Sequence, residues 1–128
     1  MKVYVSGKIG EGTISEKTRK KFEDATLELE KMGHEVFDPT AEMWQSHLQE
    51  KYKVDCRWEY RVVSFYDYVL LRDLMVLATC DAICLLSDWC WSPGARTELD
   101  YALAARKTVL ELTGSGDVKT WISGHEEE

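Results

Sequence analysis

The apolar run Ala-Ile-Cys-Leu-Leu at residues 82–86 constrains the fold more than any other feature of this sequence. Strands buried on both faces have this composition, and they occupy the centre of parallel sheets that helices cover on both sides. Parallel neighbours cannot be joined by tight turns and need long crossover connections, which are usually helical. The rest of the chain is therefore expected to alternate strands with helices.

The flanking segments supply that alternation. Short runs rich in β-branched and aromatic residues indicate strands at 2–6, 34–38 and 108–112, and residues 117–123 fit either a last strand or a short helix. Apolar residues spaced by three or four indicate helices. The expected helices are 15–32 with Ser15 as N-cap and Gly33 beyond its end, 40–53 with a weak pattern, the long apolar segment 61–79, and Ser92 to about Arg106. We predict one α/β domain at 1–123, with a parallel sheet of four or five strands and helices on both faces, and a disordered acidic tail at 124–128.

Composition narrows the class of protein. The 128 residues carry a net charge of −7, which argues against binding of a nucleic-acid polymer or an anionic membrane surface, since both need clustered cations. No stretch approaches the roughly 18 apolar residues of a membrane-spanning helix, and the N-terminus does not resemble a signal peptide, so a cytoplasmic protein is expected. The cysteines lack zinc-site spacing and are predicted to be buried, reduced thiols without a metal. They are Cys56, Cys80, Cys84 and Cys90.

Glycine-rich loops follow three of the predicted strands. Ligands of open parallel sheets bind at the carboxyl ends of the strands, so the loops 6–12, 87–94 and 113–116 are expected at the ligand site. The first loop matches neither the Walker A nor the dinucleotide-binding glycine spacing. It is either a flexible turn or a backbone cradle for a sugar or phosphate, with Lys8 as an optional cation. Its expected ligand contacts are Ser6, Gly7, Lys8, Ile9 and Gly10.

The second loop leads into a helix through Ser92-Pro93-Gly94. A helix start offers free N–H groups and a favourable dipole to an anion, although Ser92 is equally suited to be only an N-cap. Arg96 is placed either to reach that anion or to be solvated. Asp88 contacts the ligand or only solvates its loop.

Tryptophan side chains are candidates to stack on a base, Trp89 and Trp91 being best placed, or else simply pack. The tryptophans considered are Trp44, Trp58, Trp89 and Trp91.

Two acidic residues interrupt apolar helix faces. Glu98 shares its face with Tyr101 and Ala102, and Asp73 lies on a stripe of valine, leucine and tyrosine. Burial of a carboxylate is costly without partners, so the two suggest a pair with divergent pKa values, one a nucleophile and one an acid. Structural salt bridges to nearby arginines are the alternative. Tyr4, in the first strand, belongs either to the core or to this pair.

The order of several short motifs resembles the nucleoside 2-deoxyribosyltransferase superfamily. The similarity is greatest to the branch with the 2′-deoxynucleoside 5′-monophosphate N-glycosidases and many small bacterial and phage proteins. It spans nearly the whole chain and is most specific between residues 73 and 102. The motifs are Tyr4-Val-Ser-Gly7, Gly33-His-Glu-Val with Pro39 following, Arg72-Asp73-Leu74 ahead of Cys80-Asp81-Ala82, and Ser92-x-Gly94-x-x-x-Glu98 with Tyr101-Ala102.

The resemblance implies a flavodoxin-like (Rossmann-like) sheet and a homodimer or higher assembly. It implies that Glu98 attacks the anomeric carbon of a deoxyribosyl unit, that Asp73 protonates or orients the leaving base, and that Tyr4 positions Glu98. The transferases carry an acidic residue where this chain has Ser92, which favours a substrate with a 5′-phosphate. Ser115-Gly116 resembles a Ser-Gly that contacts phosphate from the neighbouring subunit. The first loop of the hydrolases has an arginine for which this chain shows no counterpart. Either Lys8 takes the place of that arginine or no residue does.

We therefore predict hydrolysis of the N-glycosidic bond of a (deoxy)nucleoside 5′-monophosphate, without a metal or organic cofactor. The alternatives are a nucleoside 2-deoxyribosyltransferase and, from another class, a non-catalytic nucleotide-binding or sequestering protein. The expected partner is a small nucleotide or nucleoside. Self-association is expected because the helix at 61–79 is apolar over more than one stripe. The residues left for another surface are Tyr66, Tyr68, Leu71 and Met75.

Overall fold

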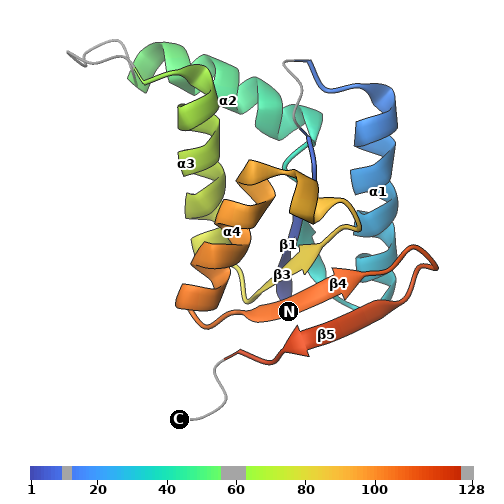
Figure 1. Cartoon of the computed structure of the whole chain (residues 1–128). Helices are drawn as coiled ribbons and strands as arrows, with labels where there is room; N and C mark the ends of the chain where they lie inside the picture. The colour runs from blue at the N-terminus through green and yellow to red at the C-terminus, as the bar shows by residue number, and fades with distance from the viewer. Residues whose placement is uncertain (10–12, 56–62, 125–128) are drawn as a thin grey trace.

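The fold is a five-stranded sheet flanked by helices (Figure 1). The computed structural model describes residues 1–9, 13–55 and 63–124. The strand order is β2-β1-β3-β4-β5, parallel except that β5 runs antiparallel to β4. This order confirms the predicted flavodoxin-like α/β domain. The elements are β1 (Lys2–Ser6), α1 (Glu16–Lys31), β2 (Glu35–Phe37), α2 (Glu42–Asp55), α3 (Phe65–Ala78), β3 (Ala82–Leu85), a 3-10 turn η1 (Trp89–Trp91), α4 (Pro93–Ala104), β4 (Thr108–Leu112) and β5 (Val118–Ile122).

The apolar run forms β3, and it lies at the centre of the sheet as predicted. All four residues of β3 are fully buried, because the strand has neighbours on both edges and helices on both faces. In Figure 1, α1 covers one face, while α3 and α4 lie together on the other. Each face has its own apolar cluster, one around Phe22 and Leu29 and the other around Leu77 and Leu99.

Local capping chemistry sets the helix boundaries. Ser15 accepts a hydrogen bond from the Thr18 N–H (3.2 Å), and Gly33 takes the left-handed conformation (φ 89°) that ends α1, as predicted. Helix α3 begins at Phe65, later than the predicted start at residue 61, because Ser64 caps it by accepting from the Asp67 N–H (3.0 Å). Residues 61 and 62 lie outside the described part of the chain.

The C-terminal segment is a strand rather than a helix. A turn closed by the Thr113 N–H donating to the Asp117 carbonyl (2.8 Å) folds β5 back along β4. Gly116 has φ 90° in this turn, a conformation that favours glycine. Gly124, where the predicted tail begins, donates its N–H to the Thr108 hydroxyl (3.0 Å), and residues 125–128 lie outside the described part.

Two side-chain environments differ from the predictions, those of Cys90 and Tyr68. Cys80 and Cys84 are buried as predicted, but Cys90 is exposed on the turn η1, and Cys56 lies outside the described residues. Tyr68 is not left over on the surface, since it packs against Leu48 of α2. Within the described ranges, none of the helices has both the length and the apolar character that crossing a membrane requires.

Candidate functional site

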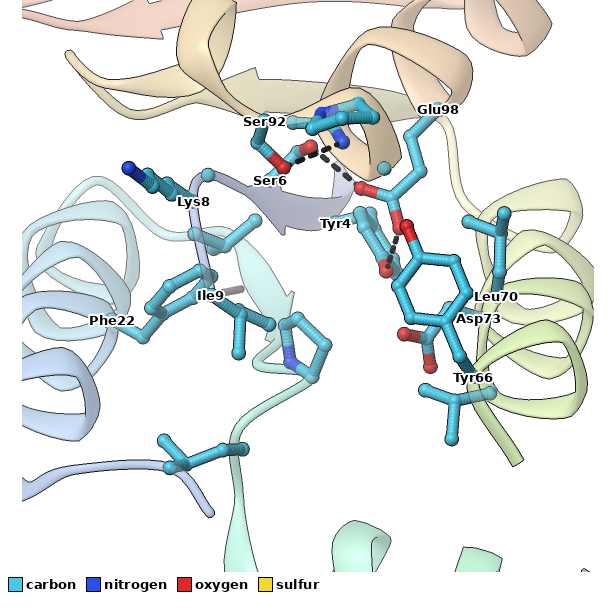
Figure 2. Close-up of a pocket in the computed structure, with 18 of the residues that line it drawn as sticks. Tyr4, Ser6, Lys8, Ile9, Phe22, Tyr66, Leu70, Asp73, Ser92 and Glu98 are labelled. Carbon is cyan, nitrogen blue, oxygen red and sulfur yellow. Dashed lines mark hydrogen bonds between the residues drawn. The ribbon is translucent and has the colours of Figure 1, made fainter. Parts of the chain in front are cut away.

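A cavity of about 390 Å³ opens at the carboxyl ends of β1 and β3 (Figure 2). The first loop, α3 and the beginning of α4 form its walls. Ten of the residues predicted for the site line it. They are Tyr4, Ser6, Gly7, Lys8, Ile9, Asp73, Trp91, Ser92, Gly94 and Glu98.

Glu98 is held at this cavity by two hydroxyl groups from β1. The Tyr4 hydroxyl donates to Glu98 Oε2 (2.7 Å) and the Ser6 hydroxyl donates to Oε1 (2.6 Å) (Figure 2). Alternate residues of a strand point to the same face, so residues 4 and 6 both meet α4. The carboxyl group is therefore fixed in orientation while it faces the cavity. Ser6 lines the cavity and is a hydrogen-bond partner of Glu98, and its contact with a ligand stays a prediction.

Burial dominates the electrostatics of Glu98. It raises the pKa of this carboxyl from its ordinary value to about 7, while the hydrogen bonds from Ser6 and Tyr4 oppose the rise because they stabilise the charged form. Burial also raises the pKa of the Tyr4 phenol, with the Glu98 charge adding to the effect. Tyr4 therefore remains a protonated hydrogen-bond donor near neutral pH.

Asp73 is the second buried carboxylate of the cavity. It comes from α3, and its Oδ1 accepts a hydrogen bond from the Trp44 indole N–H (2.8 Å). Burial and then the charge of Glu98 raise the pKa of Asp73 to about 7, while contacts with Trp44 and Tyr4 oppose this. The nearby Arg72 forms its ion pair with Asp55 (3.6 Å) rather than with Asp73.

The start of α4 offers fewer free amide groups than the sequence suggested. Ser92 is an N-cap whose hydroxyl oxygen accepts from the Ala95 N–H (3.1 Å), and its carbonyl accepts from the Arg96 N–H (3.0 Å). Pro93 has no N–H, so Gly94 supplies the remaining amide of the first turn. The Ser92 hydroxyl proton stays available because a hydroxyl oxygen that accepts can also donate. A Cβ at Gly94 would meet only the Ser92 and Tyr66 hydroxyls, each 3.8 Å away.

The first loop is fixed by contacts outside the cavity. A Cβ at Gly7 would lie 2.9 Å from the Leu86 side chain, so the loop crosses the end of β3 too closely for a larger residue. Asp88 accepts the Lys8 N–H (3.0 Å) and pairs with Lys21, which also donates to the Lys8 carbonyl (2.8 Å). Asp88 was predicted to contact the ligand, but it does not line the cavity and instead holds this loop.

Four further predicted contacts lie away from the cavity lining. Trp89 packs edge-to-face on Trp121 (5.7 Å between ring centroids), and it is Trp91, not Trp89, that lines the cavity. Arg96 points to solvent from α4. Ser115 and Gly116 are exposed on the β4–β5 turn, so their predicted contact with a neighbouring subunit's ligand stays a prediction. Gly10 lies outside the described residues.

Several lining residues were not predicted. Most are apolar side chains that line the cavity beside the carboxylates, and Gln45 adds one amide. Their helix faces look like ordinary core in the sequence, so no local signal distinguishes them. Trp44 had a usable signal, because an indole N–H inside the protein needs an acceptor and Asp73 was an inward carboxylate that needed a donor. The unpredicted lining residues are Val5, Ile14, Phe22, Pro39, Gln45, Phe65, Tyr66, Val69, Leu70, Pro93 and Ala95.

Fold and site together define a flavodoxin-like α/β protein with a carboxylate pair in a cavity at the carboxyl ends of its strands. The chain belongs to the family described as Domain of unknown function (DUF4406), whose model matches residues 1–111. The comparison with curated proteins finds no match. The matched segment contains both carboxylates and ends before the β4–β5 turn. Because the family description assigns no activity, the resemblance to the nucleoside 2-deoxyribosyltransferase superfamily stays a prediction.

Proposed function

We propose that this protein hydrolyses the N-glycosidic bond of a (deoxy)nucleoside 5′-monophosphate, with Glu98 as the nucleophile. One observation carries the proposal: two buried carboxylates from different helices face one cavity, and Glu98 is fixed there by hydroxyl donors to both of its oxygens. Cleavage of a glycosidic bond passes through an oxocarbenium-like transition state, which a carboxylate pair suits.

The first step forms a glycosyl-enzyme ester. A Glu98 oxygen bonds to the anomeric carbon while the bond from that carbon to the base nitrogen breaks. The electron pair of the broken bond stays on the base, which takes a proton from the Asp73 carboxylic acid. A carboxyl group whose pKa is raised to about 7 can act as this acid near neutral pH.

The second step releases the sugar. Water attacks the anomeric carbon, the bond to Glu98 breaks, and the Asp73 carboxylate takes the proton that the water loses. The enzyme returns to its starting state with Asp73 protonated and Glu98 charged. Tyr4 and Ser6 do not react in this scheme. They hold Glu98 in place and stabilise its charge when it is the leaving group.

The phosphate is assigned to the beginning of α4. Ser92 offers its hydroxyl proton and Gly94 its amide, and the helix dipole favours an anion at this end. Among the described residues that line the cavity, Lys8 alone carries a positive charge, so it is placed to complete the phosphate site. The volume of about 390 Å³ lies within the range of about 300–1,000 Å³ typical of small-ligand sites.

A panel of substrates tests the proposal. Deoxyribo- and ribonucleoside 5′-monophosphates and the matching nucleosides are incubated with the protein, with and without a second free base, and released or exchanged bases are separated by chromatography. Release from monophosphates alone supports the proposal. Exchange of bases favours a deoxyribosyltransferase, and binding without release or exchange favours a nucleotide-binding protein.

We also propose that the protein acts as a homodimer or larger assembly in the cytoplasm, where thiols such as Cys90 stay reduced. On α3, Leu71 and Met75 lie one turn apart, are each more than half exposed and are outside the cavity lining, so they form an exposed apolar surface, whereas the exposed Tyr66 lines the cavity. Sedimentation at micromolar concentration should show an assembly, and the double variant Leu71→Glu, Met75→Glu should be monomeric. A wild-type monomer contradicts the assembly but leaves the chemistry untouched.

A further inference from the structure

Asp73 is held by a side chain that lies outside the cavity lining. Its hydrogen-bond donor is the indole N–H of Trp44, at 2.8 Å from Oδ1. Trp44 belongs to α2 and does not line the cavity, so it acts on the carboxylate from the protein side. Glu98, in contrast, is held by two side chains that themselves line the cavity.

The Trp44 ring is itself fixed on several sides. Phe37, the last residue of β2, meets it edge-to-face (5.2 Å between centroids), and His47 stacks on it (5.7 Å). The Arg72 guanidinium lies 5.7 Å from the centre of the indole, where cation–π attraction operates. An indole held in this way has little freedom to turn its N–H away from Asp73.

The same aromatic group links the two carboxylates. Phe37 stacks on Tyr4 (5.6 Å between centroids) and touches Trp44, and β2 pairs with β1 so that Tyr4 and Phe37 are in register. The donor to Glu98 and the donor to Asp73 therefore pack against one phenylalanine. A displacement of Phe37 would disturb both.

We propose that Trp44 is a positioning residue, which holds the Asp73 carboxylate through its indole N–H and so sets the orientation and charge state in which Asp73 meets the ligand. The contact stands by itself, and its catalytic consequence rests on the proposed function. Because Trp44 acts through Asp73, its loss should alter proton transfer and leave phosphate binding alone.

The groups that act on Asp73 come from four elements. Glu98 faces it from α4, Tyr4 from β1, Trp44 from α2, and Arg72 lies beside it on α3. Glu98 raises the pKa of Asp73, after the larger effect of burial, and the other three lower it. A hydrogen bond to the charged form favours that form, so removal of the Trp44 N–H should raise the Asp73 pKa.

Trp44→Phe keeps a ring and removes the donor. Carbon-13 NMR of labelled aspartate should show the Asp73 midpoint rising by about one pH unit, the size expected for a lost hydrogen bond to a charged group. Trp121→Phe is the matched control, since Trp121 lies on β5 and its indole N–H donates to Glu111 of β4 (2.9 Å), away from Asp73. It should leave the Asp73 midpoint unchanged. An unchanged Asp73 midpoint in folded Trp44→Phe overturns the proposal.

A second measurement needs no variant. In the wild-type protein, the chemical shift of the Trp44 indole proton should change with pH at the same midpoint as Asp73. A chemical shift that stays constant through that midpoint also overturns the proposal. If the protein cleaves nucleotides, Trp44→Phe should move the basic limb of the kcat profile to higher pH by the same amount and leave KM within about twofold. If it cleaves none, the proposed function fails, and the two NMR results still decide the role of Trp44.

Discussion

Alternate residues of β1 enter two different interiors on the two faces of the sheet. Val3 and Val5 join the cluster under α1, whose buried members are all apolar. Tyr4 and Ser6 point under α3 and α4, where they donate hydrogen bonds to Glu98. One strand therefore contributes an apolar core on one side and a polar site on the other.

The difference shows where stability and function reside. The face under α1 gains free energy by removing apolar area from water. The opposite face buries Asp73 and Glu98, and the raised pKa of each shows that the charged form is disfavoured there. Changes under α1 should thus affect stability, except at Val5, Ile9 and Phe22, which also line the cavity, and changes under α3 and α4 should affect chemistry.

The largest expected effect is on catalysis. Glu98→Gln removes the proposed nucleophile but keeps the size of the side chain, so base release should fall at least about 1,000-fold, equivalent to about 4 kcal/mol of barrier. Glu111→Gln is the matched control, because Glu111 is a hydrogen-bonded carboxylate on β4 outside the cavity lining. The assay is chromatographic detection of free base, with circular dichroism to check folding. Near-wild-type turnover by Glu98→Gln removes this residue from the mechanism.

The next effect concerns the apolar face. Leu29 on α1 is fully buried and does not line the cavity. Leu29→Ala should lower the free energy of unfolding by about 3 kcal/mol, through lost burial and the cavity that remains. Urea unfolding measures this loss. Under conditions in which the variant is folded, it should keep the kcat of the wild type. A large drop in kcat would show that the face under α1 also affects the chemistry.

A smaller effect should appear in the pH dependence of stability. The folded-state pKa of Asp73 and of Glu98 is about 7, above the ordinary values of 3.8 and 4.5. The folded protein therefore holds more protons than the unfolded chain between these limits, and stability falls as pH rises from about 4 to 7. Asp73→Asn with Glu98→Gln should remove this fall and therefore gain stability relative to wild type as the pH rises from about 4 to 8. Urea unfolding at several pH values from 4 to 8 measures the free energy of unfolding of the variant and of the wild type. The same pH dependence in both proteins would contradict the prediction.

The smallest effect concerns phosphate binding. Ser92→Ala should weaken binding of the monophosphate about tenfold, about 1.4 kcal/mol, because one donor to a charged acceptor is lost. Binding of the matching nucleoside should barely change. Calorimetric titration with both ligands separates the outcomes. Equal weakening for both would assign Ser92 to the cap of α4 and not to the phosphate.

Local chemistry made much of the fold predictable. The run at 82–86 indicated a central strand, and Ser15 and Ser92 marked helix starts that the structure retains. The late start of α3 was missed because an apolar run hides its own boundary, which a single hydrogen bond to Ser64 sets.

The carboxylates of the site were predictable, but most of their partners were not. Glu98 and Asp73 were evident because each interrupts an apolar face. Trp44 lies 29 residues before Asp73, so only the packing of α2 on α3 makes it a partner. Asp88 looked like a ligand contact because its loop follows β3, yet its carboxylate is occupied by Lys21 and the Lys8 N–H.

The central claim is that Glu98 forms a covalent bond to the sugar. A deoxynucleoside 5′-monophosphate with fluorine at C2′ should slow the second step, because fluorine destabilises the oxocarbenium-like transition state. Mass spectrometry of the quenched and digested protein should then find the fluorinated sugar phosphate on the peptide that contains Glu98, with release of one equivalent of base. Steady release of base with no adduct, or an adduct on another residue, would contradict the account.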